Sequence, residues 1–430
     1  MNNCTVDGLK GAALAALLFT LSACGEPLEP PIEPEVRSLN EVEIPAGFDF
    51  ATSRDVTVSA QLSPSTDSTL VRRLHVGARD QSGTFDLMFE GFVGADGIFS
   101  AVIPLAAWRS ELTVQIEEGN EVRTADLSVR ATEAGYPRDV IRESVTIGTL
   151  QPARSPSVAS GPQRLPSDLE GFPIAYTSYY PSQSTYGTIA FEDNWPWMGD
   201  YDFNDLVLSY HVVMYRSPAF DVVAMEFFFK VEAVGAEYRN GFGLSLPVPR
   251  RRINTAYGNL SSRSDADGLE AGADNAVFIL FDTPGAATQG DPTMTNTLPG
   301  ESLVENPEIR FVVQFQTPLK DAELGTPPFD PFLFVNGDRG REIHLIGKPP
   351  TEMANASLFG TADDSGNYST PSGLPWAILV PEFWPWPSER TPVNEAHLEF
   401  VPWAESGGTL YTDWFTSKGN NRNSNKLISP

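Results

Sequence analysis

Glycine and proline occur throughout the chain and limit what it can fold into. They number 35 and 36 among 430 residues, one residue in six, and they follow no collagen-like period. Because proline breaks helix interiors and both residues favour turns, the pattern predicts many turns joined by short strands. Hydrophobic residues make up 41% of the chain, which is enough for sizeable cores. At about 100–200 residues per domain, the length predicts two or three domains.

The charge of the chain is strongly acidic. Asp and Glu number 56 against 29 Lys and Arg, which gives a formal net charge of −27. Nucleic-acid binding requires a basic surface to neutralise phosphates, so we expect no nucleic-acid partner. The same balance favours solubility and affinity for hard cations.

The first 24 residues have the pattern of a bacterial lipoprotein leader. Lys10 precedes a short apolar run, GAALAALLFTL, that is too short to span a bilayer, and the run ends in the lipobox Leu-Ser-Ala-Cys at 21–24. The pattern predicts a signal peptide over residues 1–23 and a lipid anchor at Cys24. The alternative is plain secretion. Gly25 follows the cysteine, at the position where an Asp often signals retention in the inner membrane, so we expect the outer membrane. The sequence does not decide between its periplasmic face and the cell surface.

Cysteine usage agrees with lipidation. Cys4 leaves with the signal peptide and Cys24 carries the lipid, so the mature chain has no thiol for a disulfide. Residues 24–46 are rich in Pro and Glu, a composition typical of an extended, self-repelling tether. The alternative is that part of this stretch packs on the first domain.

Two β units follow the tether. Residues 47–130 alternate apolar and polar side chains between turn signals, which predicts a small β-sandwich of immunoglobulin-like or transthyretin-like type, most simply a spacer. Residues 131–170 are rich in Pro, Ser and Gly and predict a linker. Residues 171–428 hold seven of the eight Trp in short strands broken by Gly and Pro, and predict a larger β-sandwich or jelly-roll-like domain. The fold class is therefore mainly β.

An acidic cluster lies in FEDNWPWMGDYDFNDLVLSY, residues 191–210. Asp200, Asp202 and Asn204 alternate, which is a spacing that lets oxygen ligands converge on a hard cation in a tight loop. The predicted calcium ligands are Asp200, Asp202, Asn204, Asp205, Glu192 and Asp193. The sixth position of the D-x-D-x-N pattern is not Gly, which excludes an EF-hand. The alternative is an Asx-rich turn without metal.

The segment FED-x-W-P-x-x-GDYDFNDLV resembles the signature of the LruC-domain family of bacterial surface lipoproteins. Further pieces that resemble the family follow in order: NGF at 240–242, PFDPF at 328–332, REIHL at 341–345, PPTE at 349–352, LFGTADD at 358–364 and LPWAI at 374–378. The resemblance covers about 260 residues and departs at His397, where the family more often has Tyr. It implies a surface-tethered lipoprotein of LruC-like fold with no established enzymatic activity, and it supplies no ligand residues.

Other catalytic patterns are missing from the sequence. The four His lack zinc-ligand spacing, and neither H-E-x-x-H nor G-x-S-x-G occurs. A glycan hydrolase that uses a pair of carboxylates is not excluded, because the distance between two acidic side chains cannot be read from the sequence. Four Trp are candidates for stacking on sugars, with loop packing as the alternative: Trp195, Trp197, Trp384 and Trp386. We therefore expect a calcium-stabilised outer-membrane lipoprotein with a binding or structural role and a protein or glycan ligand. The alternative function is carbohydrate binding.

Overall fold

The computed structural model describes most of the chain from residue 37 onward. The described residues are 37–61, 72–80, 82–93, 97–118, 121–129, 141–145, 151–152, 169 and 174–428. The predicted signal peptide, Cys24, the first part of the tether and most of the linker lie outside them. The fold is mainly β, as predicted, and the longest helix among the described residues has six residues. None of the described helices is long and apolar enough to cross a membrane.

The first β unit is a sandwich. Its strands are β1 (Ser53–Gln61), β2 (Arg72–Arg79), β3 (Phe85–Val93), β4 (Ile98–Ala106), β5 (Glu111–Glu118) and β6 (Glu121–Ser128), followed by β7 (Ile141–Val145) and β8 (Gln151–Pro152). One sheet has the order β4-β1-β7, and β3-β2-β5-β6-β8 form part of a second sheet. Side chains such as Val58, Leu74 and Val114 are buried in one cluster between them. Alternate residues such as Leu74 and Val76 of β2 and Leu112, Val114 and Ile116 of β5 face this core, which is why the period of two predicted the unit.

The second sheet continues from the first β unit into the larger one. Strand β3 pairs with β9 (Tyr176–Tyr180) through Phe89↔Ser178 and Glu90↔Thr177. From β9 the order runs through β11 (Leu206–Arg216), β12 (Val222–Ala233) and β16 (Glu308–Leu319) to β14 (Ile253–Tyr257). Two further strands extend it at one side, β10 (Gly187–Phe191) beside β11 and β19 (Ala377–Val380) beside β10. Twelve strands of the described residues share this sheet.

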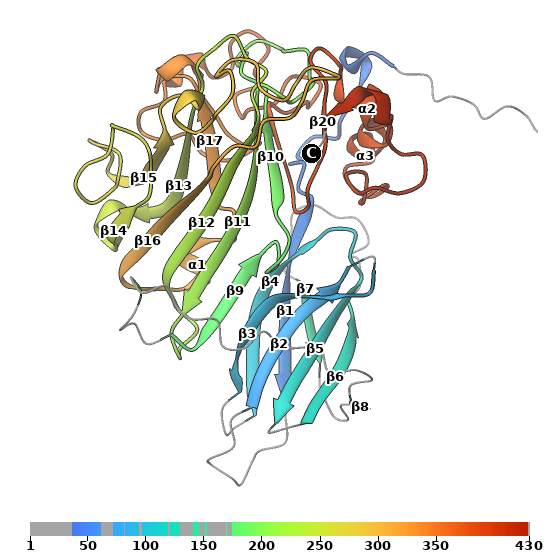
Figure 1. The fold of residues 1–430 in the computed structure, drawn as a ribbon, viewed down its shortest axis with the longest axis vertical. Helices are drawn as coiled ribbons and strands as arrows, with labels where there is room; N and C mark the ends of the chain where they lie inside the picture. The colour runs from blue at the N-terminus through green and yellow to red at the C-terminus, as the bar shows by residue number, and fades with distance from the viewer. Residues whose placement is uncertain are drawn as a thin grey trace, which may run out of the picture. The chain divides into compact units, whose positions relative to one another are not determined.

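A four-stranded sheet closes the larger sandwich. It has the order β15 (Asn275–Phe281), β13 (Gly241–Pro249), β17 (Asp330–Phe334) and β18 (Glu342–Ile343). Figure 1 shows β13 and β15 to the left of β11 and β12. The core between the two sheets combines aliphatic and aromatic side chains. Phe229 meets Phe242 and Phe278 meets Phe311, with ring centroids 5.1 and 5.2 Å apart in edge-on contacts. Such pairs add to the free energy gained by burial.

Short helices and a small ladder complete the chain. They are α1 (Asp321–Leu324), α2 (Val393–Ala396), α3 (Phe400–Glu405), the pair β20 (Trp386–Pro387) and β21 (Leu427–Ile428), and 3-10 turns at Leu39–Glu41, Arg250–Arg252, Pro284–Ala286, Val335–Gly337, Ala356–Leu358 and Ser424–Lys426. Both α2 and α3 lie at one side of the larger unit (Figure 1). They carry part of a second aromatic core that includes Trp384, Trp403 and Trp414.

The N-terminal strap, residues 37–50, packs into this second core. Leu39, Val42, Phe48 and Phe50 are buried in it, and the Phe48 ring lies edge-on to Trp403 at 5.0 Å. The sequence predicts an extended tether up to residue 46, and the burial of Leu39 and Val42 corrects this prediction for residues 37–46. The stretch packs on the larger β unit rather than on the first. Burial of these four apolar side chains outweighs the self-repulsion that the Glu-rich composition suggested.

Candidate functional site

The acidic segment forms the loop between β10 and β11. These strands pair antiparallel, with Phe191 at the end of β10 opposite Leu206 at the start of β11. Glu192, the next residue after β10, therefore lies beside Asp205, the last residue before β11. Tyr201 and Phe203 adopt left-handed backbone conformations with φ of 58° and 51°. Two left-handed residues at alternate positions curl the loop tightly and bring its carboxylates back toward Glu192.

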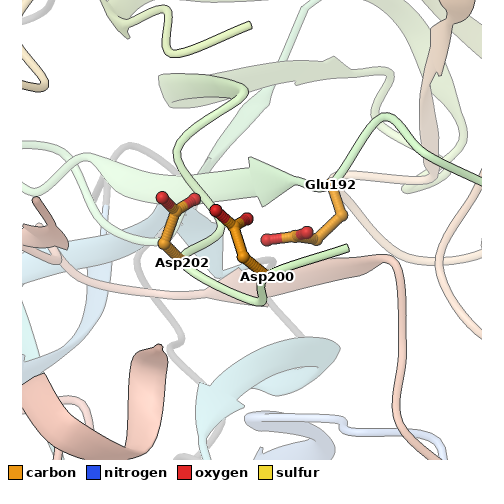
Figure 2. Close-up of side chains that lie close together, drawn as sticks. All are labelled: Glu192, Asp200 and Asp202. Atoms are coloured by element: carbon orange, nitrogen blue, oxygen red, sulfur yellow. The ribbon is translucent and has the colours of Figure 1, made fainter. Parts of the chain in front are cut away.

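Three carboxylates converge in this loop, and we call them the carboxylate triad: Glu192, Asp200 and Asp202. One oxygen from each lies within 4.8 Å of the others (Figure 2). Glu192 and Asp202 are buried, with 0% and 2% of their surface exposed, whereas Asp200 is exposed. The triad is therefore closed on the protein side and open on the side of Asp200.

Backbone amides hold the two buried carboxylates in place. Phe203 N donates to Glu192 Oε1 at 2.7 Å, and Asp202 accepts from Asn204 N at 3.1 Å and from Arg390 N at 2.7 Å. The second oxygen of Glu192 is buried and has no hydrogen-bond partner. A buried carboxylate oxygen without a partner is costly, and a bound cation would satisfy it.

The electrostatics of the triad disfavour three bare negative charges. Burial raises the pKa of Glu192 well above its usual value, and the charges of Asp202 and Asp200 raise it further. Burial also raises the pKa of Asp202 to about 8, with a further contribution from Asp200. A divalent cation would relieve both the repulsion and the lost hydration.

Of the other predicted ligands, Asp193 and Asp205 lie outside the triad, whereas Asn204 has a buried Oδ1 without a hydrogen-bond partner. Asn204 donates from Nδ2 to Pro387 O at 3.1 Å. Asp205 accepts from Asp193 N at 2.7 Å, and Asp193 accepts from Asn240 Nδ2 at 2.7 Å. Asp193 and Asp205 therefore brace the base of the loop instead of joining the triad, and the convergence of Asn204 with Asp200 and Asp202 stays a prediction.

The triad carries the oxygen donors that a hard cation prefers. Calcium takes about six to eight oxygens, so three carboxylates leave positions for water or for another ligand. Gly199 makes the close geometry possible, because a Cβ there would lie 2.0 Å from the unpartnered Glu192 Oε2. Neither Gly199 nor the amide of Arg390 was singled out in the sequence, since neither has a spacing that signals metal binding.

Three of the four Trp proposed for sugar stacking are buried. Trp195, Trp384 and Trp386 have no exposed surface, so their rings cannot meet a ligand. Trp195 instead packs on Tyr368 with centroids 5.3 Å apart, as loop packing requires. Trp197 alone of the four is exposed, at 57%.

A buried charge network lies behind the loop. Arg339 pairs with Glu270 and Glu342, and His344 contacts Asp330 through Nδ1 at 2.9 Å and Glu342 through Nε2 at 3.1 Å. The His344 ring also lies 5.2 Å from Tyr368, the residue on which Trp195 packs. Each of these charges has a partner of opposite sign, as buried charges require.

Comparison with known proteins gives information on the fold of this chain and little on its function. Residues 221–415 match a family described as a domain of unknown function, DUF4842. A crystal structure of a protein described as a "putative lipoprotein" from Bacteroides ovatus superposes with a TM-score of 0.54 at 17% identity, over 84% of this chain and 100% of that one. No curated protein sequence matches this chain. At this identity the likeness concerns the fold alone.

Proposed function

We propose that this chain is a lipid-anchored envelope lipoprotein whose larger β unit is stabilised by calcium and has a binding or structural role. The lipobox ending at Cys24 supports the anchor, and the fold likeness to a protein described as a lipoprotein agrees with it. The resemblance to LruC-domain proteins and the Gly at position 25 support the outer membrane. The acidic balance supports a protein or glycan partner rather than a nucleic acid.

The unpartnered, fully buried oxygen of Glu192 carries the calcium proposal. The Glu192 carboxylate points toward Asp200 (Figure 2) and forms one group with Asp200 and Asp202, so a cation bound there would contact all three carboxylates. Calcium suits the site better than magnesium, which keeps more of its water and takes fewer protein ligands. Bound calcium would fix the β10–β11 loop on the two sheet strands that begin and end it.

A thermal melt of residues 25–430 in calcium and in EDTA tests this proposal. A ligand that binds only the native state at a thousandfold excess over its Kd contributes about 4 kcal/mol, which would raise Tm by several degrees. Asp202→Ala should abolish the shift. Glu301→Ala removes an exposed carboxylate elsewhere and should preserve it. Identical melts of the unchanged protein in both buffers would refute the calcium site.

We propose no catalytic role for the chain. Backbone amides hold Glu192 and Asp202 of the triad in fixed positions, as suits metal ligands. The resemblance to LruC-domain proteins implies no enzymatic activity. Release of reducing sugar from a glycan incubated with the protein would contradict this and favour the glycan hydrolase.

A further inference from the structure

A pocket lies against the exposed member of the carboxylate triad. Its volume is about 390 Å³, within the range of small-molecule sites. Residues from three separate segments line it, among them Arg37, Asn40, Gly199, Asp200, Asn394 and Glu395. The N-terminal strap, the acidic loop and α2 therefore meet around one cavity, and Asp200 belongs both to the cavity wall and to the triad.

The pocket lies on the side where a bound cation would need more ligands. Glu192 and Asp202 are buried and close the protein side, so the open side is that of Asp200. Three carboxylates leave the coordination of calcium incomplete. The remaining positions are available to oxygen atoms of a molecule in the pocket.

The walls are held rigidly by contacts among the three segments. Asn394 Nδ2 donates to Arg37 O at 2.8 Å, and Val393 N donates to Tyr201 O at 2.8 Å. The amide of Arg390, four residues before Asn394, donates to Asp202. Cation binding in the triad and the shape of the pocket therefore depend on the same backbone contacts.

The charges around the pocket favour an uncharged ligand. The triad and Glu395 bring four carboxylates, which outnumber the charges of one calcium and of Arg37. Arg37 is already paired with Glu405, and Glu395 with Lys426. An anionic ligand would meet excess negative charge, whereas neutral hydroxyls can coordinate calcium and hydrogen-bond to the amide and carboxylate groups on the walls.

We propose that this pocket binds a neutral sugar whose adjacent hydroxyls coordinate the calcium held by Glu192, Asp200 and Asp202. The inference rests on the calcium site of the proposed function and adds its ligand class. It places sugar recognition on strap, loop and α2 rather than on the Trp-rich segments, three of whose rings are buried.

Saturation-transfer NMR on the soluble chain, residues 25–430, tests the proposal. The probes are the methyl glycosides of mannose, galactose and fucose, with glucuronic acid as an anionic probe, each in calcium and in EDTA. We expect transfer to a neutral glycoside in calcium and its loss in EDTA. Asn40→Trp fills the pocket and should abolish transfer, whereas Asn420→Trp places the same side chain at an exposed turn outside it and should preserve transfer.

Calorimetric titration with calcium separates the two levels of the proposal. If the unchanged protein and Asn40→Trp bind calcium equally and only the variant loses the sugar, the inference holds. Calcium binding without transfer to any neutral glycoside overturns the sugar site and leaves the calcium site standing. Transfer that persists in EDTA, or that occurs with glucuronic acid alone, also overturns it. Absence of calcium binding refutes the proposed function itself.

Discussion

Replacement of His344 by Gln should remove a specific part of the pH dependence of stability. Burial alone would lower the pKa of His344, but the charge of Asp330 and hydrogen bonds to both neighbouring carboxylates raise it from 6.5 to about 9. The difference between a pKa of 6.5 and one of about 9 corresponds to about 3 kcal/mol of stabilisation of the charged imidazole. The charged imidazole is therefore a stabilising group of the folded state.

The direction of the effect follows from which state binds the proton more tightly. Because the folded pKa is raised, the contribution of His344 is complete below pH 6.5 and is lost as pH rises through about 9. Burial would raise the pKa of Glu342, yet His344 and Arg339 hold it at about 2, so its contribution is present above 4.5 and is lost as pH falls through about 2. Both contributions are complete between pH 4.5 and 6.5.

Urea unfolding in saturating calcium, between pH 6 and 10, measures the effect. We expect the unchanged protein to lose about 3 kcal/mol of unfolding free energy across this range from His344, and H344Q to lack that loss. His397→Gln is the matched control, because His397 is equally buried but its pKa is lowered to about 3, so it stays neutral throughout. If H344Q is too unstable to measure, Asp330→Asn should move the loss to lower pH. Equal profiles in the unchanged protein and in the measurable variant would refute the reasoning.

Three further predictions concern separate parts of the chain. Gly199→Ala should weaken calcium binding by about tenfold or more in calorimetry, because its Cβ would displace the unpartnered triad oxygen, whereas Gly285→Ala, which meets no atom closer than 3.5 Å, should not. Phe48→Ala should lower the free energy of unfolding in urea by about 3–5 kcal/mol, because Phe48 is buried. The control is Leu410→Ala, which changes a side chain that is 59% exposed, and equal stability of the two variants would contradict the packing of the strap. Cys24→Ser should move the protein from the detergent phase to the aqueous phase in detergent partitioning, and retention with the membranes would argue against the anchor.

The β-sandwich architecture could be predicted from local patterns, but the strap could not. Alternation along strands such as residues 112–116 is a property of neighbouring residues. In the structure its apolar members, Leu112, Val114 and Ile116, join the core of the first β unit, and the polar residues between them are buried as well. The strap contains apolar residues at irregular spacing within a Pro- and Glu-rich stretch. Its partner for Phe48 is Trp403, more than 350 positions away. Local composition therefore indicated extension, while a distant aromatic core determines the packing.

The carboxylate triad shows the same limit at the level of a site. The D-x-D-x-N spacing correctly brings Asp200 and Asp202 together, because the loop between them curls at Tyr201. Asn204 donates from Nδ2 to Pro387 O, on a segment 183 positions later in the chain, while its Oδ1, the atom that could bind a cation, is buried without a hydrogen-bond partner. The third carboxylate is Glu192, which reaches the site because Phe191 pairs with Leu206 across the hairpin. Ligand spacing within one loop thus predicts that Asp200 and Asp202 come together. The pairing of strands β10 and β11 determines that Glu192 is the third carboxylate of the triad.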